Sequence, residues 1–302
     1  MRNLFIQILT EKAACDERIW LITPDLGFSV LEPFQEKFPS RFLNVGIAEQ
    51  NAVGVAAGLA SKGLLPYVYS IIPFVTSRCY EQVKIDCAYM NTNVRLVGVG
   101  AGFSYGAAGA THHAIDDIAI MRALPNMSIC APGCLNEAAY MAEYSLRHQG
   151  PMYIRLAKTG EPEYDFAVEF GRLAIVLEGS DFAVIATSNM LESARNTCME
   201  YQNEGKRPLL LSAHTLKPFD NGKIRELIDR GLPIVTIEEH NIIGGLASAV
   251  SEVIALHGKT ARFMPIAVPD KFSHFVGGHN FIREKMGLCN YKSNIDRFLA
   301  GI

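Results

Sequence analysis

The sequence lacks the features that mark secreted, membrane-spanning or nucleic-acid-binding chains. Its first apolar stretch meets charges at Glu11 and Lys12 before it is long enough for a signal peptide or a membrane span. It contains no basic run, and its net charge of -3 provides no excess of positive charge to neutralise phosphates. We therefore expect a cytoplasmic protein with neither a membrane nor a nucleic acid as its partner.

Metal-binding motifs, short repeats and low-complexity tracts are also missing. The seven cysteines are odd in number and scattered. The closest pair, Cys130 and Cys134, lacks a second pair or nearby histidines at the spacing of a zinc site. The sequence therefore predicts reduced, mostly buried thiols and no metal held by this chain's own residues.

The length and the hydrophobic pattern indicate two domains. A chain of 302 residues favours two cores over one. Short apolar runs alternate with longer segments of helical period, which is typical of parallel sheets covered on both faces. In the first half, strands are predicted at 19–23, 65–71, 94–100, 127–132 and 152–157, and helices at 3–15, 48–62, 75–90, 115–123 and 134–148. After a polar stretch at 158–171, further strands are predicted at 181–187, 207–212 and 233–238. We therefore expect two three-layer α/β/α domains, residues 1–165 and 166–302.

Residues 42–63, FLNVGIAEQNAVGVAAGLASKG, place one acidic side chain, Glu49, at the start of a helix made of small residues. Asn44 and Gly46 indicate a strand-to-helix turn, which puts Glu49 in the first helical turn, near the positive end of the helix dipole. Alanine and glycine suit a close approach of another backbone, so we expect this helix deep in the domain or at a subunit contact. A shielded carboxylate needs a partner. Because no lysine or arginine lies within a turn of Glu49 on the same helix, a ligand is one candidate and simple helix capping is the alternative.

Four stretches, RFLNVGIAEQN, FVTSRCYEQVKIDCAYMN, GATHHAIDDIAIMRALPNM and IVTIEEHNIIGGL, resemble in order and spacing the pyrimidine-binding and carboxy-terminal domains of transketolases. Transketolases are thiamine diphosphate enzymes, and the resemblance covers nearly the whole chain. It implies that Glu49 hydrogen-bonds the pyrimidine ring nitrogen of the cofactor, so that the exocyclic amine becomes acidic enough to take part in proton transfer. Phe74, which by itself would be assigned to the core, corresponds to the aromatic residue that stacks on the aminopyrimidine. The resemblance also assigns Asp25 and Ile71 to the cofactor site.

A glycine-rich stretch, GVGAGFSYGAAGATHHAIDD at 98–117, follows an apolar strand. It is not a dinucleotide fingerprint, because Tyr105 stands at the third glycine position counted from Gly100. The adjacent His112 and His113 cannot point the same way, so the pattern alone predicts one solvated and one structural imidazole. The resemblance identifies His112 as the histidine that contacts the sugar and serves in catalysis.

This loop departs from the family pattern. Transketolases carry Gly-Glu-Asp-Gly before the histidine, whereas this chain has Ala107 and Ala108 between two glycines, and an earlier family histidine corresponds to Gly100. The absence of these three polar groups implies a changed choice of sugar. Arg2, Ser29 and Lys158 fall near positions where the family binds the substrate phosphate, or else Arg2 and Lys158 are solvated surface residues.

Complete transketolases have a further amino-terminal domain whose Gly-Asp-Gly motif and asparagine bind Mg²⁺ and the cofactor's diphosphate. This sequence contains no Gly-Asp-Gly and no Walker-type loop. The resemblance therefore implies a split enzyme, in which an amino-terminal subunit supplies the Mg²⁺ and diphosphate site and two copies of each chain assemble into a heterotetramer. We expect this chain to form the homodimer contact. Glu238, Glu239 and His240 are assigned to the architecture, since adjacent residues are poorly placed as metal ligands.

The function predicted from these observations is the transfer of a two-carbon ketol unit between sugars or sugar phosphates. The alternatives are the beta subunit of a 2-oxo acid or acetoin dehydrogenase, a deoxyxylulose-phosphate synthase-like enzyme, and a non-catalytic regulatory subunit. GATHHAIDDIAIMRALPNM favours a transketolase over the dehydrogenases. Glu49 and Phe74 favour a catalytic subunit, whereas Ala107 and Ala108 leave a regulatory subunit open.

Overall fold

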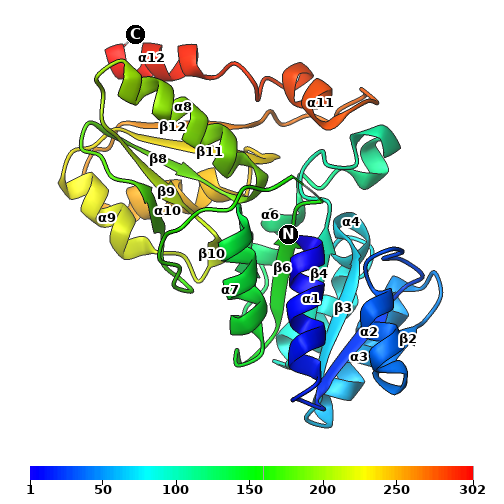
Figure 1. Cartoon of the computed structure of the whole chain (residues 1–302). Helices are drawn as coiled ribbons and strands as arrows, with labels where there is room; N and C mark the ends of the chain where they lie inside the picture. The colour runs from blue at the N-terminus through cyan, green and yellow to red at the C-terminus, as the bar shows by residue number, and fades with distance from the viewer. Residues whose placement is uncertain (159, 302) are drawn as a thin grey trace.

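The computed structural model describes residues 1–158 and 160–301, which form two α/β units in chain order (Figure 1). The first unit contains a seven-stranded sheet in the order β10-β5-β6-β4-β3-β1-β2. Its strands are β1 (Ile19–Thr23), β2 (Phe42–Asn44), β3 (Leu65–Ile71), β4 (Arg95–Val99), β5 (Ser128–Cys130), β6 (Met152–Leu156) and β10 (Thr215–Lys217). Every neighbouring pair is parallel except β10 and β5. The carboxyl ends of the parallel strands therefore meet at one edge of the sheet.

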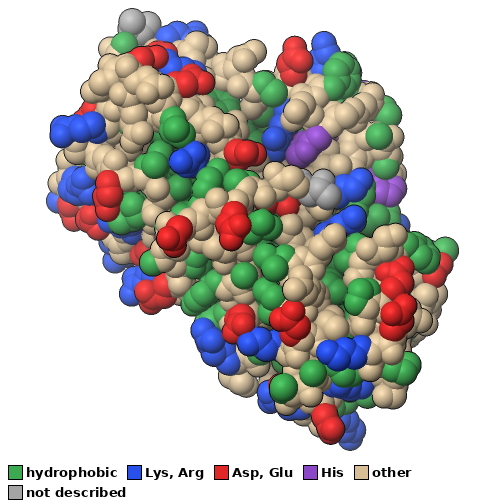
Figure 2. All heavy atoms as spheres, in the orientation of Figure 1, with side chains coloured by type: hydrophobic (Ala, Val, Ile, Leu, Met, Phe, Trp, Pro, Cys, Tyr) green, Lys and Arg blue, Asp and Glu red, His purple; other side chains and the backbone are tan. Residues whose placement is uncertain are grey.

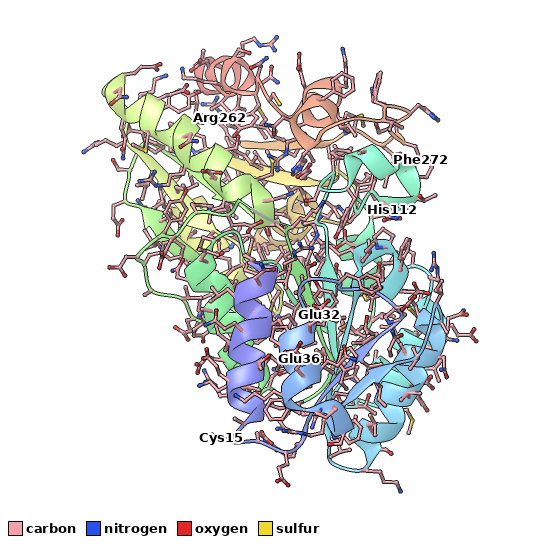
Figure 3. All side chains as sticks on the ribbon, turned by 45° about the vertical axis from the view of Figure 1, so that its right-hand side comes forward. Cys15, Glu32, Glu36, His112, Arg262 and Phe272 are labelled. Carbon is pink, nitrogen blue, oxygen red and sulfur yellow. The ribbon has the colours of Figure 1, made fainter. Side chains whose placement is uncertain are left out.

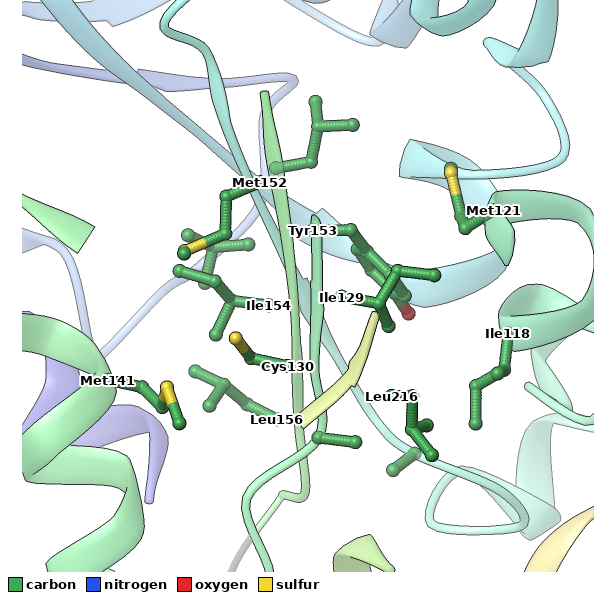
Figure 4. Close-up of a cluster of buried hydrophobic side chains, with 14 of the residues drawn as sticks. Ile118, Met121, Ile129, Cys130, Met141, Met152, Tyr153, Ile154, Leu156 and Leu216 are labelled. Atoms are coloured by element: carbon green, nitrogen blue, oxygen red, sulfur yellow. The ribbon is translucent and has the colours of Figure 1, made fainter. Parts of the chain in front are cut away.

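Helices cover both faces of this sheet. They are α1 (Arg2–Ala13), α2 (Glu32–Lys37), α3 (Glu49–Ser61), α4 (Ile72–Val75), α5 (Tyr80–Gln82), α6 (Asp117–Arg122) and α7 (Leu135–Ser145). Figure 4 shows Met141 of α7 on one side of the strands, with Ile118 and Met121 of α6 on the other. Because both faces are covered, β4 and β6 are buried at every position, which explains why they are mainly apolar apart from the buried Arg95 and Arg155.

The second unit contains a five-stranded sheet in the order β12-β11-β8-β9-β7. Its strands are β7 (Ala174–Leu177), β8 (Phe182–Ala186), β9 (Pro208–Ser212), β11 (Ile234–Asn241) and β12 (Phe263–Val268). Its helices are α8 (Leu191–Asn203), α9 (Asn221–Asp229), α10 (Leu246–His257), α11 (His279–Lys285) and α12 (Lys292–Ala300). The pairs are parallel except β7 with β9. The predicted α/β class with two sheets is confirmed.

Four strands that the sequence pattern did not predict, β2, β7, β10 and β12, all lie at the edges of the two sheets. Edge strands are short or partly exposed, so they lack the continuous apolar run of a central strand. β10 follows the proposed boundary at residues 165 and 166, yet it pairs with β5 of the first sheet. The first sheet therefore recruits a strand from the second half of the chain.

The single helix predicted at 75–90 is wrong. The chain forms α4, then a turn, then α5, which continues into a π-helical segment at Val83–Tyr89. Pro73 lies in the first turn of α4, and the Thr76 hydroxyl donates to the Ile72 carbonyl at 2.7 Å where the helix ends. The turn at 76–79 places exposed residues, including Arg78, next to Glu49.

The small-residue helix α3 buries only one face. Ala52, Val53 and Ala56 are buried, whereas Gly54 and Gly58 are exposed, and a Cβ added at either glycine would meet no heavy atom within 4 Å. Within this single chain, α3 is therefore not enclosed on all sides, and its glycine face is open to another backbone. This corrects the expectation of a helix deep in the domain and leaves the subunit contact as a prediction.

A buried arginine of the first unit, Arg155, is held by an ion pair and also bonds the second unit. Arg155 of β6 donates through Nε to Asp117 Oδ2 at 2.9 Å, and both side chains are 1% exposed. Arg155 also donates to the Ser188 hydroxyl at 2.9 Å and to the Glu239 carbonyl at 3.2 Å, both in the second unit. Strand β6, in the interior of the first sheet, is therefore tied directly to the second unit.

Five of the seven cysteines are buried and none forms a disulfide, as the sequence predicts. Among the helices within residues 1–158 and 160–301, none combines the length and apolar character needed to span a membrane.

Candidate active site

The predicted site residues gather around the carboxyl edge of the first sheet. Asp25 and Ser29 follow β1, Glu49 follows β2, and Ile71 ends β3; Phe74, His112 and Lys158 follow β3, β4 and β6. Arg2 begins α1 and lies near Tyr105 at this edge, whereas the other end of α1 leads into the amino end of β1. In open α/β sheets, ligands bind at this edge because the strand-to-helix loops converge there. The topology thus brings together residues that lie far apart in the sequence.

Glu49 is buried, with 4% of its surface exposed, at the first position of α3. Its Oε1 accepts a hydrogen bond from Arg78 Nη1 at 2.8 Å, and the Arg78 side chain is 45% exposed. Arg78 comes from the turn between α4 and α5, so it could not be found among the residues of α3 itself. The carboxylate therefore has a partner within the chain, supplied by the turn that joins two helices after β3.

Three aromatic rings, which we call the aromatic row, extend from this ion pair: Phe74, His112 and Tyr105. The Arg78 guanidinium lies 4.1 Å from the centre of the Phe74 ring. The centres of Phe74 and His112 are 5.0 Å apart at an angle of 69°, and those of His112 and Tyr105 are 6.2 Å apart. Lys158 Nζ lies 4.8 Å from the centre of the Tyr105 ring. The row therefore has a cation at each end, Arg78 beside Glu49 and Lys158 at the far end.

The two adjacent histidines point to different surroundings. His112 is half-buried at the edge of Phe74, on the side of the molecule where the two units meet (Figure 3). His113 is buried, and its ring lies 5.0 Å from that of Phe103 at 88°. Burial and the nearby Arg78 charge both lower the pKa of His112, which favours the neutral imidazole. His113 is therefore enclosed in the protein, whereas the half-buried His112 belongs to the aromatic row.

The glycines of the 98–109 loop let this chain's own side chains approach the backbone. Gly100 has φ +96, and a Cβ there would lie 2.2 Å from the Tyr105 ring. Gly102 has φ +61, and a Cβ there would lie 2.4 Å from the Glu239 carboxyl carbon. The glycines of this loop therefore allow Tyr105 and Glu239 to pack against its backbone.

Of the phosphate-site candidates, Arg2 and Lys158 approach the same ring. Burial raises the pKa of Tyr105, and the neighbouring Arg2 charge opposes that rise. Ser29 is exposed, and its backbone is left-handed with φ +63. It lines a cavity beside α1 whose lining residues include neither Arg2 nor Lys158. The structure therefore pairs Arg2 with Lys158 around Tyr105 and leaves Ser29 outside that pair.

Asp25 and Ile71 border the Glu49 region from the two adjacent strands. Asp25 is exposed, and its Oδ1 accepts a hydrogen bond from Asn44 Nδ2 at 2.9 Å. Asn44 also accepts from the Gly46 amide at 3.0 Å, in the loop that leads to Glu49. Ile71 is half-buried as the last residue of β3. Asp25 is therefore connected through Asn44 to the loop that precedes Glu49. Ile71 directly precedes α4, the helix that carries Phe74.

A polar cavity of about 290 Å³ lies next to Lys158, between the two units. On the face shown in Figure 2, basic and histidine side chains gather where the units meet. The polar lining residues include Ser104, Lys158, Glu161, Asn189, Glu192, His279 and Arg283. Sequence reasoning missed the contribution of α11, because His279 and Arg283 lie far along the chain from the loop that they face.

Buried carboxylates of β11 fix this junction. Glu239 accepts from the Phe103 amide at 3.1 Å, from His279 at 2.8 Å and from Arg283 at 2.7 Å. Burial alone would raise the pKa of Glu239, but Arg283 and His279 hold it at about 2. Glu238 instead accepts from the amides of Leu246 and Ala247 at the start of α10, and His240 accepts from the Ala119 amide. These separate partners agree with an architectural role for residues 238–240.

In the described part of the chain, His, Cys, Asp and Glu side chains form no group of three or more that could hold a metal ion.

Comparison with known proteins places both units in one family. Residues 1–161 match the transketolase pyrimidine-binding domain, and residues 171–278 match the transketolase C-terminal domain. The chain is 35% identical over 261 residues to a subunit of the apulose-4-phosphate transketolase of Actinobacillus succinogenes, covering 85% of this chain and 84% of that protein. It is 33% identical over 294 residues to the 6-deoxy-6-sulfo-D-fructose transketolase subunit SqwH of a Clostridium species, covering 95% and 90%.

This chain corresponds to only part of some longer relatives, but to nearly all of a solved split subunit. A 1-deoxy-D-xylulose-5-phosphate synthase of Aquifex aeolicus is 35% identical over 292 residues, but this chain covers only 46% of it. A solved structure described as a split-gene transketolase in an inactive beta4 tetramer superimposes with a TM-score of 0.88 at 31% identity, covering 99% of this chain and 96% of that one. Because both units and most of the length of the split subunits are matched, this chain belongs to the transketolase family, with the pyrimidine-binding and carboxy-terminal domains of a split enzyme.

Proposed function

We propose that this chain is the carboxy-terminal subunit of a split transketolase, a transferase that moves a two-carbon ketol unit between sugars. The observation that carries the proposal is the placement of Glu49, the aromatic row and Lys158 along one sheet edge, in a chain whose length matches split subunits rather than complete enzymes. The cytoplasmic location expected from the sequence is part of the same proposal.

The residues present fit the pyrimidine end of thiamine diphosphate. Glu49 offers a buried carboxylate as an acceptor, and Phe74 offers an aromatic face beside it. A flat nitrogen-containing group, the Arg78 guanidinium, already makes both contacts at once. When bound, the cofactor supplies the nucleophilic carbon that makes and breaks carbon–carbon bonds beside a ketone.

Within the cofactor site, Glu49 would act as the catalytic carboxylate. Its burial, with only 4% exposed, strengthens a hydrogen bond to a ring nitrogen, since little water competes for the carboxylate. Phe74 would stack on the ring, Ile71 would contact it from the end of β3, and Asp25 would border the site from the loop after β1.

The sugar would lie along the aromatic row. His112, whose pKa is lowered mainly by burial, would exchange hydrogen bonds with sugar hydroxyls and serve in proton transfer close to the reacting carbons. Lys158 and Arg2, which converge on Tyr105, would receive a phosphate or another anionic end of the sugar, with Ser29 as a more peripheral contact.

The substrate is expected to differ from that of a typical transketolase. Ala107 lies in a short 3-10 turn next to Ala108, and neither side chain can bond a sugar hydroxyl. The two relatives with whole-length matches are named for apulose 4-phosphate and for a sulfofructose, which are different sugars. We therefore propose a ketose or ketose phosphate without assigning its identity.

The diphosphate and Mg²⁺ are proposed to be held mainly by an amino-terminal partner subunit. The described residues of this chain contain no cluster suited to the metal. The exposed glycine face of α3, with Gly54 and Gly58, would let a second backbone approach closely, which supports a homodimer at the centre of a heterotetramer.

Reconstitution tests this proposal. The chain is mixed with its proposed amino-terminal partner subunit, thiamine diphosphate and Mg²⁺, and consumption of ketose donors is measured with and without aldose acceptors. We expect ketol transfer only when both chains are present. Release of a product from a 2-oxo acid donor with an aldehyde acceptor, without use of a ketose donor, would instead support a synthase of the deoxyxylulose-phosphate type.

A further inference from the structure

We propose that Arg78 occupies the place of the cofactor's pyrimidine ring in the free subunit and must leave when thiamine diphosphate binds. This inference rests on the proposed function of Glu49 and Phe74. It adds a residue that no family assignment required, and it makes Arg78 a competitor of the cofactor rather than one of its ligands.

The geometry of Arg78 matches the two contacts expected of an aminopyrimidine. Its Nη1 donates to Glu49 Oε1 at 2.8 Å, as an N–H group of the cofactor ring would. Its guanidinium carbon lies 4.1 Å from the centre of the Phe74 ring, close to the spacing of stacked planar groups. A guanidinium and an aminopyrimidine share a flat N–C–N arrangement, so the same acceptor and the same aromatic face can hold either.

The two groups compete, because one carboxylate and one ring face define a single position. A ring that bonded Glu49 and stacked on Phe74 would overlap the guanidinium. On the other side of the row, the edge contact of His112 with Phe74 limits the space left for a second planar group.

Arg78 is also free to leave. Its side chain is 45% exposed, and it lies in the turn between α4 and α5 rather than within a regular helix. In contrast, Glu49 is 4% exposed and stays at the start of α3. Without a cofactor, Arg78 keeps this buried carboxylate paired, which avoids the cost of an isolated buried charge.

Displacement of Arg78 reduces the apparent affinity for the cofactor. It breaks one half-exposed ion pair and one cation–π interaction, which together correspond to roughly a 3- to 30-fold change in affinity. Arg78→Ala should therefore bind thiamine diphosphate about 3- to 30-fold more tightly in the assembled enzyme. The same substitution should lower the melting temperature of the free subunit, because Glu49 loses its partner there.

Isothermal titration calorimetry of the two-subunit complex with thiamine diphosphate and Mg²⁺ tests the proposal, together with thermal unfolding of the free chain. If the Arg78→Ala variant does not assemble with the partner subunit, Arg78→Gln replaces it in this experiment. The glutamine side chain can still form a hydrogen bond with Glu49, but it carries no charge. Arg18→Ala is the matched control, because Arg18 is also exposed and paired with an acidic residue, Asp16, and it should leave the affinity unchanged.

The outcomes are distinct. Tighter cofactor binding with a less stable free chain supports displacement of Arg78. Unchanged or weaker binding in both Arg78 variants would overturn it, because Arg78 would then be a structural or cofactor-holding residue. If Glu49→Ala leaves the affinity for thiamine diphosphate unchanged, the proposed cofactor site itself fails, and the inference on Arg78 fails with it.

Discussion

Replacing Glu49 with glutamine keeps the size of the side chain and removes its charge. In the free chain, this substitution turns the ion pair with the half-exposed Arg78 into a neutral contact, so we expect a stability loss of no more than about 1 kcal/mol. In the complete enzyme, it removes a charge-assisted hydrogen bond from a nearly dry position, which is worth about 1.5 to 3 kcal/mol, or roughly 10- to 150-fold in rate. It also removes the group that shares a proton with the cofactor ring. Turnover should therefore fall by at least roughly 100-fold while folding stays intact.

The assay for Glu49→Gln is ketose donor consumption by the reconstituted complex, with circular dichroism and thermal unfolding of the free subunit to verify folding. Glu252→Gln is the matched control, because Glu252 is 61% exposed and pairs with Arg122 away from the aromatic row. The control should keep the turnover of the parent. A Glu49→Gln enzyme that turned over at the parent rate would refute the catalytic role of this carboxylate.

Three further substitutions test other parts of the structure. In the free chain, NMR titration should give His112 a pKa below the usual histidine value. Arg78→Ala should raise that pKa, because it removes a nearby positive charge. An unchanged His112 pKa in this variant would contradict the electrostatic contact between Arg78 and His112. Burial raises the pKa of Glu137 from 4.5 to about 7, so its contribution to stability is present below pH 4.5 and is lost as the pH rises through 7. Urea unfolding should therefore show Glu137→Gln gaining about 3 kcal/mol relative to the parent between about pH 4 and about pH 8, whereas a constant difference would argue against the raised pKa. Arg155→Met leaves Asp117 buried without its cation, so it should cost about 3 to 5 kcal/mol of unfolding free energy; a loss below about 1 kcal/mol would show that the ion pair is dispensable.

The central strands could be predicted from the sequence because their position dictates their composition. β3, β4, β6 and β8 are covered on both faces, so their residues are mainly apolar. The edge strands carry no such constraint, and β10 in particular is defined by a partner, β5, that lies far earlier in the chain. No local pattern could indicate that a strand from the second half joins the first sheet.

The placement of the candidate site residues was predictable where a motif carries the chemistry. Glu49 and Phe74 were assigned by resemblance and both contact the Arg78 side chain, and the different surroundings of His112 and His113 follow from their adjacency. Arg78 was missed although it stands within one of the matching stretches. The sequence predicted one continuous helix from residue 75, and such a helix gave no reason to direct Arg78 toward α3. In the structure, the turn between α4 and α5 directs Arg78 toward Glu49.

The contribution of α11 lay beyond sequence reasoning for a different reason. His279 and Arg283 converge on Glu239, which in turn packs against Gly102 and bonds the Phe103 amide of the glycine-rich loop. None of these contacts has a recognisable sequence motif. The polar cavity beside Lys158 forms only because residues from both units come together at the junction.

The most direct measurement of the central claim is a crystal structure of the reconstituted two-subunit enzyme with thiamine diphosphate. We expect the Glu49 carboxylate to lie about 3 Å from a ring nitrogen of the pyrimidine, with Phe74 stacked on that ring. A Glu49 side chain that faces solvent, away from any bound cofactor, would contradict the account.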